Sequence, residues 1–172
     1  MLEIEIKCPC DDLAAVESKL IGLGAKPLGE VQQADVYLAH PCRDFGSTDE
    51  ALRLRREGEE VTLHYKGPKL DKVSKSREEI GAPLVKPEAV RTIFDRLGFR
   101  PVSEVRKSRR SFVLGEVEVS LDSVAGLGGF VELEVQDRPL EEGRSMLFDL
   151  MKVLGLERTE RRSYLELLLE KG

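Results

Sequence analysis

Apolar and polar residues alternate along several short segments of this chain, and this two-residue period is typical of β-strands that bury one face. The first such segment opens the sequence, where Leu2, Ile4 and Ile6 alternate with charged residues. Turn signals with a central glycine separate later segments, as at 57–59 and 114–116. The pattern predicts further strands at 31–39, 51–57, 60–66, 105–114, 116–123 and 130–136.

Three other segments repeat apolar residues at a spacing of three to four, which is the period of amphipathic helices. These predicted helices span 12–23, 87–97 and 141–154. Gly24 and Gly98 directly follow the first two, and glycine readily adopts the left-handed conformation that ends a helix. Near the C-terminus, 161–169 has no clear period, so strand and helix both remain open for it.

The chain also contains an internal repeat that needs no gap. Glu5 aligns with Glu79 at an offset of 74 residues, and the same offset aligns Gly24 with Gly98. In each copy, a short alternating strand is followed by a proline turn, an amphipathic helix and another strand.

The repeat predicts one domain over residues 1–172, in two halves of about 1–72 and 73–172. Each half is interpreted as a β-α-β-β-β unit, which places the fold in the α+β class. Two such units sharing one antiparallel sheet can close into a β-barrel with the helices packed outside.

Charged residues make up 34% of the 172 residues, and 27 basic side chains nearly balance 32 acidic ones. Recurring apolar residues exclude a disordered chain, and the net charge of −5 argues against a nucleic-acid-binding surface. No apolar stretch approaches the roughly 20 residues of a membrane span, and the N-terminus lacks a signal-peptide pattern. We therefore expect a cytoplasmic protein with neither membrane nor nucleic acid as partner.

The three cysteines, an odd number, also fit a reducing compartment better than a disulfide framework. Cys8, Cys10 and Cys42 could instead form a metal site together with His40. Their spacing matches no common zinc pattern, so this alternative is disfavoured.

Charge on the predicted strands is sorted by strand. Arg53 and Arg55 share one face of their strand, and Glu132 and Glu134 share one face of another. A single strand of this kind is compatible with a solvated or salt-bridged face, but here the pattern recurs throughout the domain. If helices cover the apolar faces of a barrel, the charged faces point into its lumen. Such a lumen is costly when dry, whereas a polyanion with divalent metal ions would complement it.

Several charged motifs follow one another in a fixed order along these strands. They are Glu3-Ile4-Glu5-Ile6-Lys7, Gln33-Ala34-Asp35-Val36-Tyr37, Ala51-Leu52-Arg53-Leu54-Arg55, Lys66-Gly67-Pro68-Lys69, Arg77-Glu78-Glu79, Val105-Arg106-Lys107-Ser108-Arg109, Leu121-Asp122, Gly129-Phe130-Val131-Glu132-Leu133-Glu134 and Ser163-Tyr164. In this order they resemble the CYTH superfamily of triphosphate tunnel proteins, which includes class IV (CyaB-type) adenylyl cyclases and thiamine triphosphatases. The resemblance covers essentially the whole chain and implies a duplicated antiparallel barrel around a charged tunnel.

The resemblance also implies roles for individual residues. The metal-binding carboxylates would be Glu3, Glu5, Asp122, Glu132 and Glu134. The triphosphate-binding cations would be Lys7, Arg53, Arg55, Lys66, Arg77, Lys107 and Arg109. The residues expected to be catalytic are Glu5, Arg55 and Asp122. The implied cofactor is Mg²⁺ or Mn²⁺, with two ions expected, and a homodimer is a further expectation from the family.

Other charged residues at or near these motifs have less defined roles. Glu79 and Glu118 are expected in the tunnel, whereas Asp35 is expected to give structural support. Lys69, Lys72 and Lys75 lie on a Gly-Pro loop. We expect these lysines to be solvated, with a basic lid over the tunnel mouth as the alternative.

The implied reaction is cyclisation of ATP to cyclic AMP and pyrophosphate, because the stretch 40–53 resembles the CyaB branch more than the thiamine branch. A metal-dependent triphosphatase acting on inorganic triphosphate, thiamine triphosphate or a nucleoside triphosphate is the alternative, since the motifs describe only a grip on triphosphate. A non-catalytic triphosphate or polyphosphate binder is a third possibility, disfavoured by the number of acids. No adenine pocket can be identified from the sequence.

Overall fold

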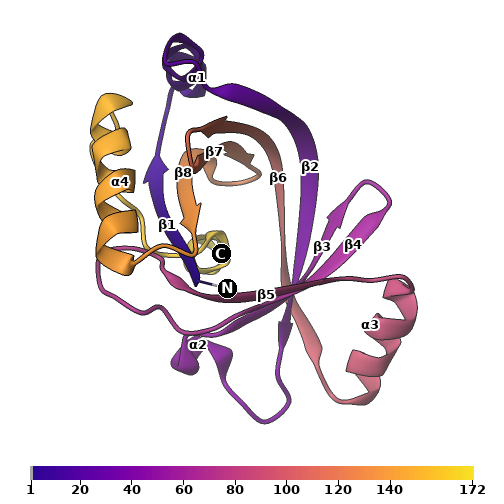
Figure 1. The fold of residues 1–172 in the computed structure, drawn as a ribbon. Helices are drawn as coiled ribbons and strands as arrows, with labels where there is room; N and C mark the ends of the chain where they lie inside the picture. Colours follow the sequence, from indigo (N-terminus) through magenta and orange to yellow (C-terminus); the bar gives the residue numbers. More distant parts are fainter. Residues whose placement is uncertain (1) are drawn as a thin grey trace.

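Eight antiparallel strands close into a barrel in the computed structural model, which describes residues 2–172 (Figure 1). The order around the barrel is β1-β5-β4-β3-β2-β6-β7-β8. The strands are β1 (Leu2–Pro9), β2 (Lys26–Ala39), β3 (Ala51–Glu57), β4 (Glu60–Lys66), β5 (Arg77–Pro83), β6 (Arg100–Leu114), β7 (Val117–Val124) and β8 (Gly128–Gln136). The predicted α+β fold with a closed antiparallel barrel is confirmed.

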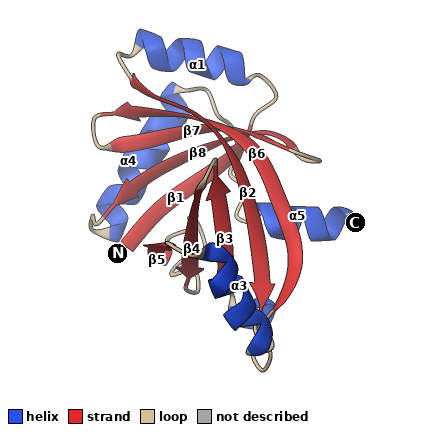
Figure 2. Cartoon of the chain, turned by 90° about the vertical axis from the view of Figure 1, so that its right-hand side faces the viewer, coloured by secondary structure: helices blue, strands red, loops and turns tan. Residues whose placement is uncertain are grey.

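The helices lie outside the barrel wall. They are α1 (Leu13–Gly22), α2 (Phe45–Thr48), α3 (Pro87–Arg96), α4 (Leu140–Val153) and α5 (Tyr164–Lys171). Helices α1 and α4 cover the same side of the barrel, over β1 and β8 (Figures 1 and 2). Helix α5 lies by β6 and the β7–β8 turn, where Lys171 Nζ donates to the carbonyl of Gly126. Among the described residues, no helix is long and apolar enough to cross a membrane.

The main apolar core lies between the barrel wall and its outer helices. On β1, Ile4 and Ile6 are at most 1% exposed and pack in one cluster with Leu20 of α1 and Leu147 of α4. The alternate residues of the same strand point into the lumen, where Glu5 is only 3% exposed. The alternation in the sequence therefore separates an apolar outer layer from a charged interior.

Strands β2 and β6 begin earlier than the sequence pattern predicts, at Lys26 and Arg100 rather than at 31 and 105. Their early parts contain Pro27 and Pro101, and proline has no amide hydrogen to donate to a neighbouring strand. The β2–β6 ladder shifts register after Pro27 and again where it reaches Pro101. Bulges are places where a sheet accommodates proline, so both strands extend through them.

The chain ends in a helix, which settles the open assignment of 161–169. Ser163 Oγ accepts a hydrogen bond from the Glu166 amide, and the Glu166 carboxylate accepts one from the Ser163 amide. This reciprocal capping box favours a helix start at Tyr164. Gly24 and Gly98 have positive φ angles of 84° and 92°, as predicted for residues that end helices.

Candidate functional site

A cavity of about 840 Å³ occupies the barrel interior and opens at the end near α2 and α5. Most of the charged residues that the sequence placed in a tunnel line this cavity. They are Glu3, Glu5, Arg53, Arg55, Lys66, Arg77, Glu79, Lys107, Arg109, Glu118, Glu132 and Glu134. Two others, Lys7 and Asp122, are buried behind the lining and do not contribute to it.

Three carboxylates gather on one wall of the cavity. Glu5 on β1 lies directly opposite Glu134 on β8, and Glu3 is the next inward-pointing residue of β1. One carboxylate oxygen from each lies within 4.8 Å of the others. We call Glu3, Glu5 and Glu134 the carboxylate trio.

The electrostatics of the carboxylate trio favour binding of a divalent cation. Burial raises the pKa of Glu3 to about 9, even though Lys66 opposes the shift. Burial, with a contribution from Glu5, raises the pKa of Glu134 to about 7. Burial also acts to raise the pKa of Glu5, but Lys75 and Lys66 outweigh it and lower that pKa. Oxygen ligands of this type suit Mg²⁺ or Mn²⁺, whose charge would relieve the crowding of acids.

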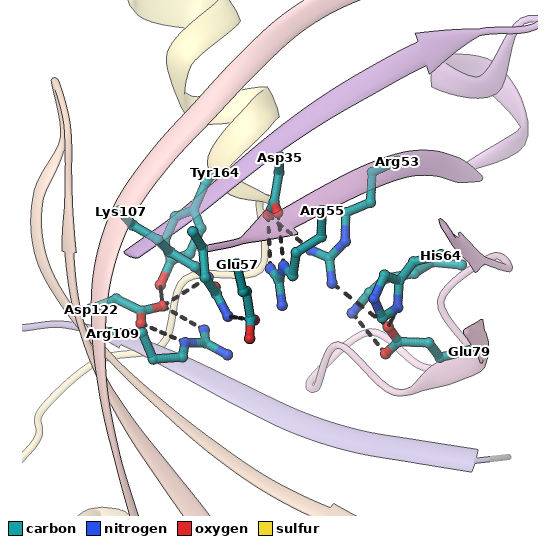
Figure 3. Close-up of polar contacts among 12 residues, drawn as sticks. Asp35, Arg53, Arg55, Glu57, His64, Glu79, Lys107, Arg109, Asp122 and Tyr164 are labelled. Carbon is teal, nitrogen blue, oxygen red and sulfur yellow. Dashed lines mark hydrogen bonds and ion pairs between the residues drawn. The ribbon is translucent and has the colours of Figure 1, made fainter. Parts of the chain in front are cut away.

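The other two predicted metal ligands are held by cations instead. Asp122 is fully buried and accepts hydrogen bonds from Arg109 Nε and Nη2, at 2.7 and 2.6 Å, and from Lys107 Nζ at 3.1 Å (Figure 3). The Tyr164 hydroxyl also donates to it, at 2.7 Å. Glu132 accepts from Arg109 at 2.5 Å. These two acids therefore orient the cations, and the structure does not bring them into the carboxylate trio.

An arginine pair faces the carboxylate trio from the other side of the barrel. Arg53 and Arg55 lie on β3, half-way around the strand order from β1 and β8. Both are held by Asp35 of β2, which accepts from Arg55 Nε and Nη2 at 2.7 Å each and from Arg53 at 3.3 Å (Figure 3). Burial opposes ionisation of Asp35, but Arg53 and Arg55 outweigh it and lower its pKa. Asp35 therefore supports the arginines, as expected.

Two lysines pair with carboxylates of the cavity. Lys66 Nζ lies 2.9 Å from Glu3 and 3.1 Å from Glu79, and Lys75 Nζ lies 2.5 Å from Glu5. The expectation that the loop lysines are solvated is wrong for Lys75, whose side chain is 11% exposed and lines the cavity. The sequence carried a signal for this, because Lys75 continues the alternation of Arg77 and Glu79.

The other two loop lysines differ from Lys75. Lys72 is exposed, in agreement with the expectation. Lys69 Nζ instead pairs with Asp49 at 2.6 Å, and its amide also donates to that carboxylate. The loop is thus fastened at two of its lysines rather than freely solvated along its length.

Lys7 holds the C-terminal segment rather than lining the cavity. It is 0% exposed, and its Nζ donates to the carbonyl of Arg162 and lies 4.2 Å from the centre of the Tyr164 ring. Burial, with help from Lys75, lowers the pKa of Lys7 to about 7. The backbone carbonyl of Lys7 also accepts from the amide of Glu160 at 2.7 Å.

Two polar side chains of the cavity were given no site role by the sequence reasoning, although Tyr164 belongs to one of the quoted motifs. His64 Nδ1 lies 2.9 Å from Glu79 in the cavity wall, and Tyr164 reaches Asp122 from the C-terminal helix. Only the strand alternation could have indicated His64, whereas the position of Tyr164 depends on how the helix packs.

The disfavoured cysteine–histidine metal site finds no support in the geometry. Cys8 lies in the apolar core, where burial raises its pKa to about 12, and Cys42 is exposed. His40 Nδ1 accepts from the amide of Cys42 at 3.0 Å. Within residues 2–172, the carboxylate trio is the one group of three such side chains with ligand atoms close enough to share an ion.

Comparison with known protein families and curated proteins identifies relatives over nearly the whole chain. Residues 1–165 match the CYTH domain. A protein of Methanocaldococcus jannaschii named as a candidate adenylate cyclase is 41% identical, with 97% of this chain and 98% of that protein aligned. The adenylate cyclase CyaB of Aeromonas hydrophila is 26% identical, with 94% of this chain and 86% of that protein aligned.

Solved structures show the same fold. The PH1819 protein of Pyrococcus horikoshii has a TM-score of 0.88 at 41% identity, covering 99% of each chain. A candidate adenylyl cyclase of Hippeastrum, described as having a dominant triphosphatase activity, has a TM-score of 0.70 at 19% identity. That comparison covers 99% of this chain and 95% of the Hippeastrum chain, and it supports the fold alone.

Proposed function

The chain belongs to the CYTH family, and on this premise we propose that it is a metal-dependent class IV adenylyl cyclase. The proposed reaction converts ATP to cyclic AMP and pyrophosphate. Its support comes from the named relatives and from one arrangement in the barrel, in which the carboxylate trio and the arginine pair Arg53 and Arg55 lie on opposite walls of one cavity. A triphosphate with a bound cation has the charges to fill the space between them.

The cations of the cavity would bind the phosphate oxygens. Asp35 accepts from two N–H groups of Arg55 and so fixes the orientation of its guanidinium, and Asp122 does the same for Arg109. A guanidinium held in this way suits bidentate contacts with phosphate oxygens. Lys107 is crowded by burial and by Arg109, which lower its pKa to about 8. An anion beside Lys107 would favour its charged form. These groups would stabilise negative charge on the departing pyrophosphate.

In the proposed reaction, the ribose 3′-oxygen forms a bond to the α-phosphorus and loses its proton, which ends on the released pyrophosphate. The bond from the α-phosphorus to the bridging oxygen breaks, and pyrophosphate leaves with that electron pair. Mg²⁺ or Mn²⁺ held by Glu3, Glu5 and Glu134 would supply Lewis acidity. Asp122 and Glu132 are engaged by Arg109, so a second ion would need most of its ligands from the phosphates.

A metal-dependent triphosphatase is the second candidate, because the carboxylate trio and the cations of the cavity suit a triphosphate whatever organic group it carries. The same residues would bind the substrate, with water attacking the terminal phosphorus. A non-catalytic triphosphate binder is a weaker proposal, because the carboxylate trio has no purpose in holding an anion alone. We further propose a cytoplasmic location, which suits the three free cysteines, and a homodimer remains a prediction.

Product analysis distinguishes these candidates. The purified protein is incubated with ATP, inorganic triphosphate and thiamine triphosphate, each with Mg²⁺ and with Mn²⁺. Cyclic AMP with pyrophosphate is the expected result, and orthophosphate released from a triphosphate would replace the cyclase by the triphosphatase. Tight metal-dependent binding without turnover would support the non-catalytic triphosphate binder. An Arg56→Ala variant serves as a control, because Arg56 lies outside the cavity lining and its side chain is 44% exposed.

A further inference from the structure

His64 lies in the cavity wall, although the cations proposed above to bind the phosphates do not include it. It belongs to β4, two residues before Lys66, and both side chains line the cavity. The side chain of His64 is 18% exposed, and its strand runs between the strands that carry Arg53 and Glu79 (Figure 3). An ionisable ring thus lies among the residues expected to hold phosphate.

A glycine on the neighbouring strand makes room for the imidazole ring. His64 pairs with Gly81 of β5, and a Cβ atom on Gly81 would lie 3.3 Å from His64 Nδ1 and 3.4 Å from Cε1. The shorter of these separations is tighter than an ordinary van der Waals contact, so a side chain at Gly81 would push against the ring. Because Gly81 has none, the ring can lie against β5 beside Glu79.

Glu79 fixes the orientation of the ring and the position of its hydrogen. His64 Nδ1 lies 2.9 Å from the Glu79 carboxylate. Burial opposes ionisation of Glu79, but the hydrogen bond with His64 and the charge of Lys66 help to outweigh it and lower the pKa of Glu79. An ionised carboxylate only accepts hydrogen bonds, so Nδ1 of the ring carries the hydrogen. Within residues 2–172 this is the one side-chain hydrogen bond of His64, which leaves Nε2 for a ligand.

The charges around the ring oppose one another in the absence of a ligand. Arg53 faces His64 from β3 and Lys66 follows it on β4, and both cations disfavour a second positive charge on the ring. Glu79 on β5 favours that charge, and the next carboxylate, Glu3 of β1, lies 2.9 Å from Lys66 Nζ. A triphosphate bound by these cations would bring several negative charges to the ring and favour its protonated form.

We propose that His64 is a further phosphate-binding residue of the cavity, which donates from Nε2 to a phosphate oxygen when the ring is protonated. This inference rests on the proposed function, since it concerns the same triphosphate. Glu79 is the positioning residue, because it holds Nδ1. A neutral ring with its hydrogen on Nδ1 presents only a lone pair at Nε2, which repels a phosphate oxygen. Binding of triphosphate is therefore coupled to uptake of a proton by His64.

Calorimetric binding of inorganic triphosphate tests this coupling without requiring turnover. The parent and His64→Gln are titrated with triphosphate and Mg²⁺ at pH 6 and at pH 8.5. The matched control is His40→Gln, which replaces the other histidine of the chain. His40 Nδ1 accepts from the backbone amide of Cys42 instead of pairing with a carboxylate. Each variant is compared with the parent at the same pH, so that titration of triphosphate and of the carboxylate trio cancels.

We expect His64→Gln to weaken binding about 10- to 100-fold at pH 6, the range for a hydrogen bond to a charged group, and less than about threefold at pH 8.5. His40→Gln should bind like the parent at both pH values. A structural role of His64 would produce equal losses at the two pH values. That result, or the absence of any loss, would overturn the proposal.

An NMR titration of the His64 ring gives a second measurement that does not need the His64→Gln variant to fold. In His40→Gln protein His64 is the one remaining histidine, which assigns its ring signals. Triphosphate should raise the pH at which the ring loses its proton, and an unchanged midpoint would contradict the proposal. A parent protein that binds no triphosphate would refute the proposed function and this inference together. Triphosphate binding with a pH-independent loss in His64→Gln would refute the inference alone.

Discussion

The hydroxyl of Tyr164 donates a 2.7 Å hydrogen bond to Asp122, a fully buried carboxylate that also holds Lys107 and Arg109 (Figure 3). Tyr164 begins the C-terminal helix, so this bond connects the last helix of the chain to the phosphate-binding cations inside the barrel. Lys7 and Lys107 also lie over the Tyr164 ring, at 4.2 and 4.8 Å from its centre. The C-terminal helix therefore helps to position the cations of the proposed site.

Tyr164→Phe should lower stability by about 1–3 kcal/mol, because it leaves a buried carboxylate oxygen with one donor fewer. It should also lower kcat. Asp122 loses one of the contacts that fix it, and Asp122 in turn positions Lys107 and Arg109. Urea unfolding and steady-state kinetics measure the two effects. Tyr65→Phe is the matched control, because Tyr65 donates to Glu50, which Arg43 also holds. Equal effects of the two substitutions would contradict a special role for Tyr164.

Glu5→Gln should reduce turnover by at least about 100-fold, because it removes one charge of the carboxylate trio and the partner of Lys75. Its affinity for Mn²⁺ should fall in parallel, which calorimetry measures directly. Glu78→Gln removes an exposed carboxylate from β5 and should change neither quantity. Full turnover by folded Glu5→Gln protein would show that the trio is not the metal site.

Arg55→Ala should abolish turnover, because Arg55 makes the two-pronged contact with Asp35 and projects into the cavity. Its loss also leaves Asp35 buried with one partner fewer, and breaking a buried ion pair costs about 3–5 kcal/mol. Arg55→Lys keeps the charge without the fork, so it should fold better and still lose most activity. The control is Arg56→Ala, whose side chain is 44% exposed on the next residue. Comparable kcat/KM values for Arg55→Lys and the parent would show that turnover does not need the two-pronged geometry of the guanidinium.

The barrel was predictable because its alternation is nearly unbroken. Strands β3 and β4 have the limits expected from the sequence, since a glycine turn separates them and Leu52, Leu54, Val61 and Leu63 alternate with polar residues. The inward direction of the charges followed from the same alternation. The early starts of β2 and β6 did not, because tolerance of Pro27 and Pro101 depends on bulges formed with a partner strand.

The grouping of the five predicted metal ligands was beyond the sequence because it depends on register between strands. On β1 and β8, Glu5 falls opposite Glu134, which creates the carboxylate trio. On β6 and β7, Asp122 falls opposite Arg109 and accepts a hydrogen bond from its guanidinium. Residue types alone do not distinguish the two arrangements, since β7 and β8 both carry acids among their inward-facing residues.

The raised pKa values of Glu3 and Glu134 predict an unusual dependence of stability on pH for the cation-free protein. Glu3 and Glu134 have pKa values raised to about 9 and about 7, whereas an unfolded glutamate titrates near 4.5. Between pH 5 and 7 the folded state therefore holds more protons than the unfolded state. By linkage, the free energy of unfolding falls as pH rises through this window. Above pH 7, Lys7 and Lys107 contribute with the opposite sign, because burial lowers their pKa values to about 7 and about 8.

The Tm of chelator-treated protein should accordingly fall by several degrees between pH 5 and 7 and level off above pH 7. Mg²⁺ or Mn²⁺ binds the ionised carboxylates, so either ion should raise the Tm more at pH 7 than at pH 5. The Glu134→Gln variant cannot ionise at residue 134. Its Tm should therefore fall less between pH 5 and 7 and should rise less when the ion is added. Calorimetric melts at several pH values, with and without Mn²⁺, measure all three effects. A Tm that climbs steadily from pH 5 to 7 without metal, or an Mn²⁺ effect independent of pH, would contradict the proposed protonation of the carboxylate trio.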